Sequence, residues 1–250
     1  MTLQSIPSKI RAAVQRGGLR ELCRVVSNSL FIHVSPRGRR WLRSVRRSDA
    51  DFDLERGTDT AGLISQWDVG PVLGNRDDAV RYEGTDALEL RRMLDALSLD
   101  FPTHTFVDLG SGKGRVLLVA AEYPFRSVVG VEYAVNLHTT AERNIWIDRG
   151  PRRCRDVRSI LGDAAAFSPP PGPLLVYLYN PFKKSIVVQV LANLQSARNI
   201  EPREILILTY RQQSECPSSV FTDRGFALLS CEGEFSLYRA DGQGLSTCAS

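Results

Sequence analysis

The stretch TFVDLGSGKGR, residues 105–115, decides the fold of this chain. A run typical of a buried strand meets Asp108, and three glycines then follow at every second position. From the last glycine, the sequence GRVLLVAAEY, residues 114–123, has the pattern of a helix. Glycine lets the backbone turn sharply and approach a ligand closely, so this strand–glycine–helix unit predicts a ligand site at the carboxyl end of a strand.

Strands and helices alternate around this unit. The pattern predicts strands at 105–110, 127–133, 157–164, 173–180 and 204–210, and helices at 85–98, 114–123, 135–148 and 184–197. Because these strands are almost continuously apolar, they fit a parallel sheet covered on both faces. FALLSC and EFSLYRA, on either side of Glu232-Gly233, form an expected antiparallel hairpin. The fold class is therefore α/β, a doubly wound, seven-stranded, mostly parallel sheet ending in an antiparallel hairpin.

Composition excludes several classes of protein. The chain has 250 residues, of which 43% are hydrophobic and 24% charged, as in an ordinary globular protein. No apolar run is long enough for a membrane span, and no apolar segment follows the early basic residues as a secretory signal would require. The five cysteines are scattered without CxxC spacing, which argues against a metal site or a disulfide framework. We therefore expect a cytoplasmic protein.

Basic residues concentrate near the N-terminus. Residues 1–50 carry eleven Lys or Arg against two acids, and SPRGRRWLRSVRR (35–47) is a dense cluster. A solvated basic face is the favoured interpretation, and the alternative is that 37–47 binds an anionic partner, RNA or a lipid surface. Residues 48–80 lack sustained periodicity and read as a connector, in which 52–62 fits neither helix nor strand. We predict a basic helical extension and connector at 1–80, a ligand-binding domain at 81–241 and a flexible tail at 242–250.

The residues around the glycines narrow the choice of ligand. A P-loop requires Gly at position 107 and Ser or Thr at 114, directly after Lys113, where this chain has Val107 and Gly114. The spacing G-x-G-x-G is also one residue shorter than the dinucleotide fingerprint. Since Asp108 ends the strand with an anion, it disfavours a pyrophosphate and suits a ligand that carries an ammonium or sulfonium charge.

Two further acids lie at the ends of the next strands. Glu132 follows Gly112 by 20 residues and ends the second strand, where a carboxylate can accept hydrogen bonds from both ribose hydroxyls. Asp163 ends the third strand at the same edge, where an adenine contact and a helix N-cap are equally good interpretations. A cationic amino-acid head, a ribose and an adenine together describe S-adenosylmethionine.

The motifs FVDLGSGKGR, GVEY, LGDA and YNPF resemble, in this order, those of the class I (seven-strand, Rossmann-like) S-adenosylmethionine-dependent methyltransferases. The resemblance covers roughly residues 80–240. It implies that the methionine part is held by Asp108, Gly110, Ser111, Gly112 and Gly114, the ribose by Glu132, and the adenine by Tyr133, Asp163 and Ala164. RYEGTDALELRRMLDAL (81–97) is similar to the segment before the first motif in non-SET lysine methyltransferases, where a Tyr and a Thr help close the methionine site. Tyr82 and Thr85 are the matching positions, although a core role for Tyr82 is an equal alternative.

YNPF (179–182) ends the fourth strand, and is similar to the motif (Asn/Asp)-Pro-Pro-aromatic of family members that methylate nitrogen. In such a site Asn180 would orient the acceptor nitrogen, Pro181 would stiffen the turn, and Phe182 would pack on the acceptor. This chain has one proline where the motif has two, and an ordinary turn is the alternative interpretation.

The sequence thus predicts an S-adenosylmethionine-dependent methyltransferase, acting on a nitrogen of a protein side chain or a small amine. Two alternatives remain. One is an O-methyltransferase of a small metabolite. The other is a non-catalytic cofactor-binding module whose basic arm contacts RNA. We assign no metal ligand.

Overall fold

The structure, a computed structural model, describes residues 48–64, 70–73, 82–179, 183–211 and 217–241. Contacts divide the chain into two compact units, Met1–Ser48 and Asp49–Ser250, and the elements below belong to the second. Residues 49–64 fall in the unit that contains the sheet, whereas our predicted boundary lies at residue 80. The basic cluster at 37–47, the Asn180–Phe182 segment and the tail at 242–250 lie outside the described residues.

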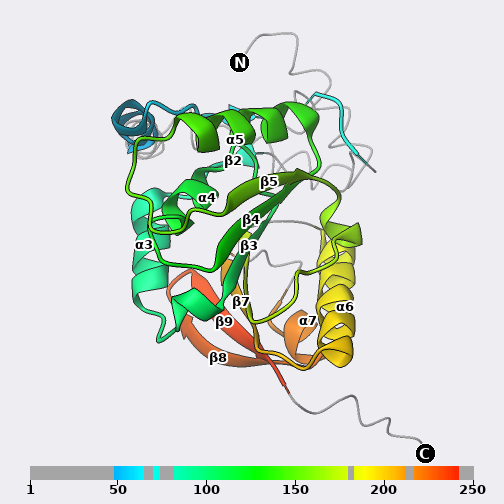
Figure 1. The fold of residues 1–250 in the computed structure, drawn as a ribbon. Coiled ribbons are helices and arrows are strands. Elements are labelled where there is room, and N and C mark those ends of the chain that lie inside the picture. The colour runs from blue at the N-terminus through cyan, green and yellow to red at the C-terminus, as the bar shows by residue number, and fades with distance from the viewer. Residues whose placement is uncertain (1–47, 65–69, 74–81, 180–182, 212–216, 242–250) are drawn as a thin grey trace, which may run out of the picture. The chain divides into compact units, whose positions relative to one another are not determined.

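Seven strands form one sheet in the order β5-β4-β3-β6-β7-β9-β8 (Figure 1). They are β3 (Thr105–Leu109), β4 (Ser127–Glu132), β5 (Val157–Leu161), β6 (Leu174–Tyr179), β7 (Ile205–Tyr210), β8 (Phe226–Glu232) and β9 (Phe235–Ala240). The first five are parallel to one another, and β9 pairs antiparallel with both β7 and β8. This arrangement confirms the predicted mostly parallel sheet with a terminal hairpin.

Helices cover both faces of the sheet. The helices are α3 (Ala87–Asp95), α4 (Arg115–Ala120), α5 (Val135–Ile147), α6 (Lys184–Ile200) and α7 (Ser219–Thr222), with short 3-10 turns η2 (Phe101–Thr103) and η3 (Ala164–Ala166). One core cluster joins α3 and α4 to Phe106 and Tyr177, and the other joins α6 and α7 to Val107 and Val176. Neighbouring residues of each strand therefore face opposite cores, which is why the central strands are apolar throughout.

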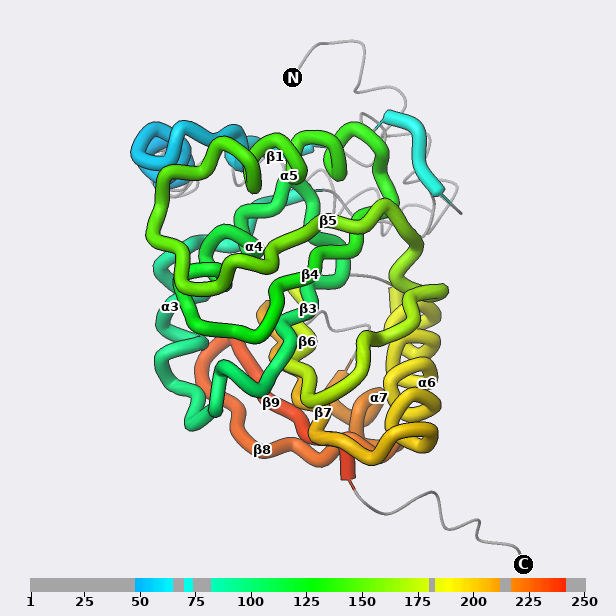
Figure 2. The backbone as a smooth tube through the Cα atoms, in the orientation of Figure 1, coloured from blue at the N-terminus to red at the C-terminus, as the bar shows by residue number. Residues whose placement is uncertain are grey.

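The strand order also fixes where a ligand can bind. The chain continues from β3 to its neighbour β4 on one side, and β6 pairs with β3 on the other. The order thus reverses at β3, and Figure 2 shows the glycine-rich connection to α4 leaving the sheet at this place. Ligands of open α/β sheets bind outside the carboxyl ends of the strands at such a switch point.

One local prediction was wrong. Residues 49–56 are helical, although 52–62 fitted neither helix nor strand. This helix is short and is stabilised by the polar contacts described below. Its sequence therefore shows little of the apolar periodicity that predicts a helix. The N-cap of α3 is Asp86, whose carboxylate accepts from the N–H groups of Leu88 and Glu89. Two further short strands, β1 (Leu63–Ile64) and β2 (Tyr82–Glu83), pair antiparallel outside the main sheet.

None of the helices in the described part of the chain is long and apolar enough to span a membrane. The same residues contain no group of three or more His, Cys, Asp or Glu side chains placed to hold a metal ion.

Candidate active site

All three glycines of the glycine-rich loop adopt a backbone conformation that favours glycine. Gly110, Gly112 and Gly114 have φ angles of 84°, 55° and 86°, in the left-handed region. Gly112 is also approached closely, because a Cβ placed there would lie 2.1 Å from a ring carbon of Tyr82. A side chain at Gly112 would therefore displace the Tyr82 ring.

Glu132, the last residue of β4, faces this loop. One carboxylate oxygen accepts from the N–H of Gly112 at 2.7 Å and the other from the N–H of Ala134 at 2.9 Å. The residue is only 3% exposed. Burial raises the pKa of Glu132 to about 6, although hydrogen bonds from the N–H groups of Ala134, Gly112 and Tyr133 act in the opposite direction. A carboxylate offers about four acceptor positions, so beside these three N–H groups Glu132 retains capacity for a ligand hydroxyl.

Asp108 is a second buried carboxyl group at the same place. It lies in β3 between Gly130 of β4 and Tyr177 of β6, and is 3% exposed. Burial, and then the neighbouring charge of Glu132, raise the pKa of Asp108 well above its usual range. Two buried acids side by side create an environment that a cation would stabilise.

Ser111 contributes a polar atom with no protein partner. Its hydroxyl is buried and has no hydrogen bond to any described residue. It also lies against Gly130, where a Cβ would come within 2.6 Å of the Ser111 oxygen. A buried hydroxyl normally has a hydrogen-bond partner, so this atom marks a place for a polar ligand group.

Tyr82 and Thr85 both lie at this edge of the sheet. The Tyr82 ring packs on Gly112, and its hydroxyl donates to the Thr60 carbonyl oxygen at 2.7 Å. The Thr85 hydroxyl lies 3.0 Å from the hydroxyl of Tyr177, the residue paired with Asp108. The structure thus brings the segment 82–85 together with the glycine-rich loop, as its position before the first motif led us to expect.

The residues expected at the adenine end lie after β4 and β5. Tyr133 follows Glu132 directly and is half-buried. The Asp163 carboxylate caps η3 by accepting from the N–H of Ala165 at 2.9 Å, and Ala164 packs in the core on the α6 face. The N-cap interpretation of Asp163 is therefore observed. Its contact with adenine stays a prediction.

At the acceptor end, β6 stops at Tyr179, immediately before the segment Asn180–Phe182 that lies outside the described residues. The Tyr179 ring stacks on Tyr210, the last residue of β7, with ring centroids 5.4 Å apart. Arg211 follows at φ 50°, places its guanidinium over the Tyr210 ring, and donates to Glu234 at 2.9 Å. The sequence did not reveal this aromatic pair, because YLY and LTY read as ordinary strand ends.

Sequence reasoning also missed the contacts that join residues 57–61 to the glycine-rich loop. Asn144 and Thr60 carry most of them and are fully buried. A signal for Asn144 was present, since it continues the spacing of Leu137 and Ala141 along the buried face of α5. No pattern marked Thr60, because it lies in a loop.

Comparison with models of known protein families gives a match to part of the sequence. Residues 81–149 match the model of a family described as histone methylation protein DOT1. That range runs from the segment before β3 to the end of α5, and so includes the glycine-rich loop and Glu132. No curated protein matches the chain at a significant level.

Solved structures are similar at low identity. An S-adenosylmethionine-dependent methyltransferase from Leishmania major is 14% identical, with a TM-score of 0.46 over 62% of this chain and 70% of that one. An RNA methyltransferase from Salinibacter ruber, solved with S-adenosyl-L-homocysteine, is 19% identical, with a TM-score of 0.42 over 67% and 100%. A predicted N6-adenine-specific DNA methylase from Listeria monocytogenes is 13% identical, with a TM-score of 0.47 over 64% of this chain and only 52% of that one. At these values the likeness says nothing about the acceptor.

The main evidence is thus the sheet order, the loop that faces Glu132, and the match over residues 81–149. S-adenosylmethionine is the cofactor of the class to which these features point, and the buried acids and the Ser111 hydroxyl fit it. The chain has the Rossmann-like fold and the motifs of the class I S-adenosylmethionine-dependent methyltransferases and, over residues 81–149, resembles the DOT1 family of histone methylation proteins.

Proposed function

We propose that the protein transfers a methyl group from S-adenosylmethionine to a nitrogen atom of a protein side chain or a small amine. The observation that carries this proposal is the pairing of Glu132 with the N–H of Gly112, beside the buried Asp108. This arrangement supports a cofactor that combines a ribose with a cationic amino-acid part.

The proposed cofactor complements the charges of the site. S-adenosylmethionine carries an ammonium and a sulfonium, both positive, and a single carboxylate. Asp108 would face the cationic amino-acid end, and the carboxylate of Glu132 would accept from the ribose hydroxyls. The Ser111 hydroxyl would gain the partner that it lacks among the described residues. Tyr133, Asp163 and Ala164 would border the adenine.

The reactive part of the proposal concerns positioning. S-adenosylmethionine, when bound, supplies an electrophilic methyl group attached to a sulfonium. The chain's contribution is to hold the acceptor nitrogen in line with that methyl group and to keep water away. Such positioning and exclusion of water can accelerate a reaction strongly without a dedicated base. A nitrogen acceptor that arrives neutral offers its lone pair directly, so we name no general base.

Asn180, Pro181 and Phe182 are the residues proposed to hold the acceptor. The register of β6 pairs Tyr177 with Asp108, so the chain leaves β6 at Tyr179 on the edge where the cofactor site lies. The stacked rings of Tyr179 and Tyr210 at this edge support an acceptor that benefits from aromatic faces, as a nitrogen gaining positive charge does. The choice of nitrogen rests on the similarity of YNPF to the nitrogen-methylating motif.

The test is a transfer assay with cofactor labelled on the methyl group. Purified protein is incubated with cell lysate, and the label is counted separately in the protein, RNA and small-molecule fractions. Label in protein or in small amines supports the proposal. Label in a small-molecule fraction that contains methyl ethers or esters favours an O-methyltransferase instead, and so does an Asn180→Ala variant that keeps full turnover.

The assay also addresses the non-catalytic alternative. If calorimetry shows cofactor binding but no fraction takes up label, the protein is a cofactor-binding module and the proposed transfer is wrong. Gly112→Arg is the negative control, because its side chain fills the space beside Tyr82 and should abolish both binding and transfer.

A further inference from the structure

The loop at residues 57–61 is shaped by a single half-buried carboxylate. Asp53, in the helix at 49–56, accepts from the Thr58 hydroxyl at 2.8 Å, the Thr60 hydroxyl at 2.7 Å, and the N–H groups of Thr60 and Ala61. Burial alone would raise the pKa of Asp53, but these hydrogen bonds outweigh it and lower the pKa. The loop is therefore fixed in one conformation by its own helix.

Asn144 connects this loop to the glycine-rich loop. The Asn144 side chain forms a reciprocal pair with the backbone of Asp59, accepting from its N–H and donating to its carbonyl oxygen, both at 2.9 Å. The same Asn144 amide nitrogen donates to the Lys113 carbonyl oxygen, also at 2.9 Å. Lys113 lies between Gly112 and Gly114, so a side chain from α5 holds the centre of the proposed cofactor loop.

Thr60 makes the second connection. Its hydroxyl donates to Asp53 and accepts from the Arg115 side chain at 2.9 Å, and its carbonyl oxygen accepts from the Tyr82 hydroxyl. Thr60 is 0% exposed. The Tyr82 ring in turn packs on Gly112. Thr60 thus sets the position of the ring that covers the loop.

We propose that Asn144 and Thr60 are positioning residues for S-adenosylmethionine, acting through Lys113 and Tyr82 and not by contact with the cofactor. The inference rests on the proposed function for its cofactor. Groups held by buried hydrogen bonds keep the geometry that binding requires, whereas groups left to move lose affinity. Their loss should therefore loosen the glycine-rich loop and weaken cofactor binding in a protein that still folds.

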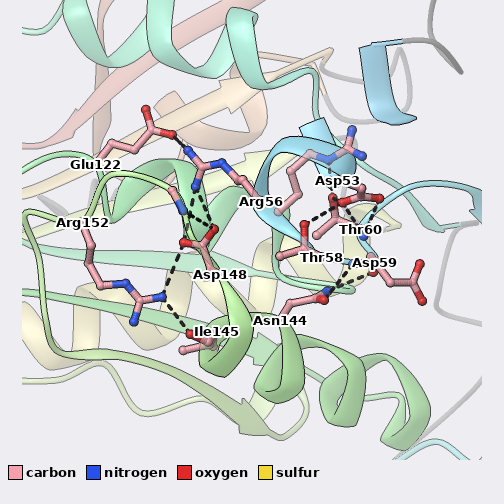
Figure 3. A network of polar contacts seen from close by, with 12 residues as sticks. Asp53, Arg56, Thr58, Asp59, Thr60, Glu122, Asn144, Ile145, Asp148 and Arg152 are labelled. Carbon is pink, nitrogen blue, oxygen red and sulfur yellow. Dashed lines mark hydrogen bonds and ion pairs between the residues drawn. The ribbon is translucent and has the colours of Figure 1, made fainter. Parts of the chain in front are cut away.

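The same segment carries an internal control. Figure 3 shows a second network of polar side chains, in which Arg56 contacts Glu122 and Asp148, and Arg152 contacts Asp148. In the described structure, none of these four side chains bonds to Thr60, Asn144 or the glycine-rich loop. Glu122→Gln therefore perturbs the anchoring of the 49–56 helix without touching the connection we propose.

The experiment measures S-adenosylmethionine affinity by calorimetry in full-length protein for Asn144→Ala, Thr60→Val, Thr60→Ser and Glu122→Gln. We expect Asn144→Ala to bind S-adenosylmethionine about tenfold more weakly. Removing a hydrogen bond that orients a metal ligand lowers metal affinity by about 10–100-fold, and our value is the lower end of that range. Thr60→Val should weaken binding, while Thr60→Ser, which keeps the hydroxyl, and Glu122→Gln should stay within about twofold of wild type.

Amide hydrogen exchange of the ligand-free protein gives a second readout that does not require the cofactor. Peptides that cover residues 108–118 should exchange faster in Asn144→Ala and Thr60→Val, but not in Glu122→Gln. Unchanged exchange and affinity in folded Asn144→Ala would overturn the inference. So would equal losses in Glu122→Gln, which indicate general destabilisation.

The outcomes separate the two proposals. If wild-type protein does not bind S-adenosylmethionine, the proposed function and the cofactor role of Asn144 fail together, and exchange still decides whether the loop is held. If wild type binds and both variants bind equally well, only the positioning role fails. Should Asn144→Ala not fold, the Thr60→Val and Thr60→Ser pair decides.

Discussion

At Gly112 both the backbone conformation and the neighbouring side chain require glycine. Its φ of 55° and the Tyr82 ring beside it make glycine necessary there. Gly233, in the turn between β8 and β9, has a similar φ of 59° but no atom within 4 Å of an added Cβ. The two glycines therefore separate the cost of the backbone conformation from the cost of the contact.

We predict that Gly112→Ala destabilises the protein more than Gly233→Ala does. The excess should be about 1–3 kcal/mol, the usual cost of forcing extra atoms into a packed site. Urea denaturation of both variants measures it, and calorimetry should show weaker S-adenosylmethionine binding for Gly112→Ala alone. Equal losses of stability would mean that the Tyr82 ring moves aside freely.

The pKa of Glu132, raised to about 6 by burial, gives cofactor binding a pH dependence. Above this pH Glu132 is a carboxylate that can accept from a ribose hydroxyl. Below it, the protonated group has lost part of that capacity, so we expect affinity to fall as pH decreases through about 6. The neighbouring groups are the N–H groups of Gly112, Tyr133 and Ala134 and the carboxyl of Asp108.

Calorimetric titrations at several pH values between 5 and 8 measure this effect, with Glu132→Gln as the control. The variant should bind more weakly at pH 8 and lack the wild-type decrease near pH 6. A wild-type affinity that stays constant across the range would contradict the assigned ribose contact.

At the scale of elements, the N-terminus of α3 offers a test that is independent of the ligand. Asp86 caps this helix by accepting from the N–H groups of Leu88 at 2.8 Å and Glu89 at 3.2 Å. Replacing such a cap by alanine typically costs about 1 kcal/mol. We expect this loss for Asp86→Ala in urea denaturation, and a much smaller one for Asp86→Asn, which retains an acceptor. Equal stability of the two variants would show that the cap contributes nothing.

The connection after β6 is the element on which the proposed transfer depends. We predict that Asn180→Ala leaves cofactor affinity within about twofold and lowers kcat by about 10²–10³, the range seen when a polar group that stabilises a transition state is removed. Single-turnover transfer with labelled cofactor measures this change. A decrease below about threefold would remove Asn180 from the proposed acceptor site.

Sequence patterns predicted the elements of the sheet for a physical reason. Strands such as β3 and β6 are buried on both faces, and their apolar runs are therefore continuous and easily recognised. The helix at 49–56 escaped prediction because Phe52 is its one buried apolar side chain, and polar contacts of Asp53 and Arg56 supply the rest of its anchoring. A helix of that kind leaves no periodic signal in the sequence.

At the scale of the whole molecule, the strand order places every described candidate residue at one edge of the sheet. Parallel strands present their carboxyl ends together, so Asp108, Glu132 and Asp163 were predictable as neighbours from their positions alone. Glu132 also accepts from the N–H of Gly112, in the loop that follows β3. Asn144 and Thr60 were not predictable in this way, because their roles depend on one loop packing against another.

The most direct test of the central claim is calorimetry of wild-type protein with S-adenosylmethionine at pH 8, repeated with Glu132→Gln. Our account predicts one binding site per chain in the wild type, at least tenfold weaker in the variant, which corresponds to about 1.4 kcal/mol or more. Absence of binding by the wild type, or equal affinity in the two proteins, would contradict it.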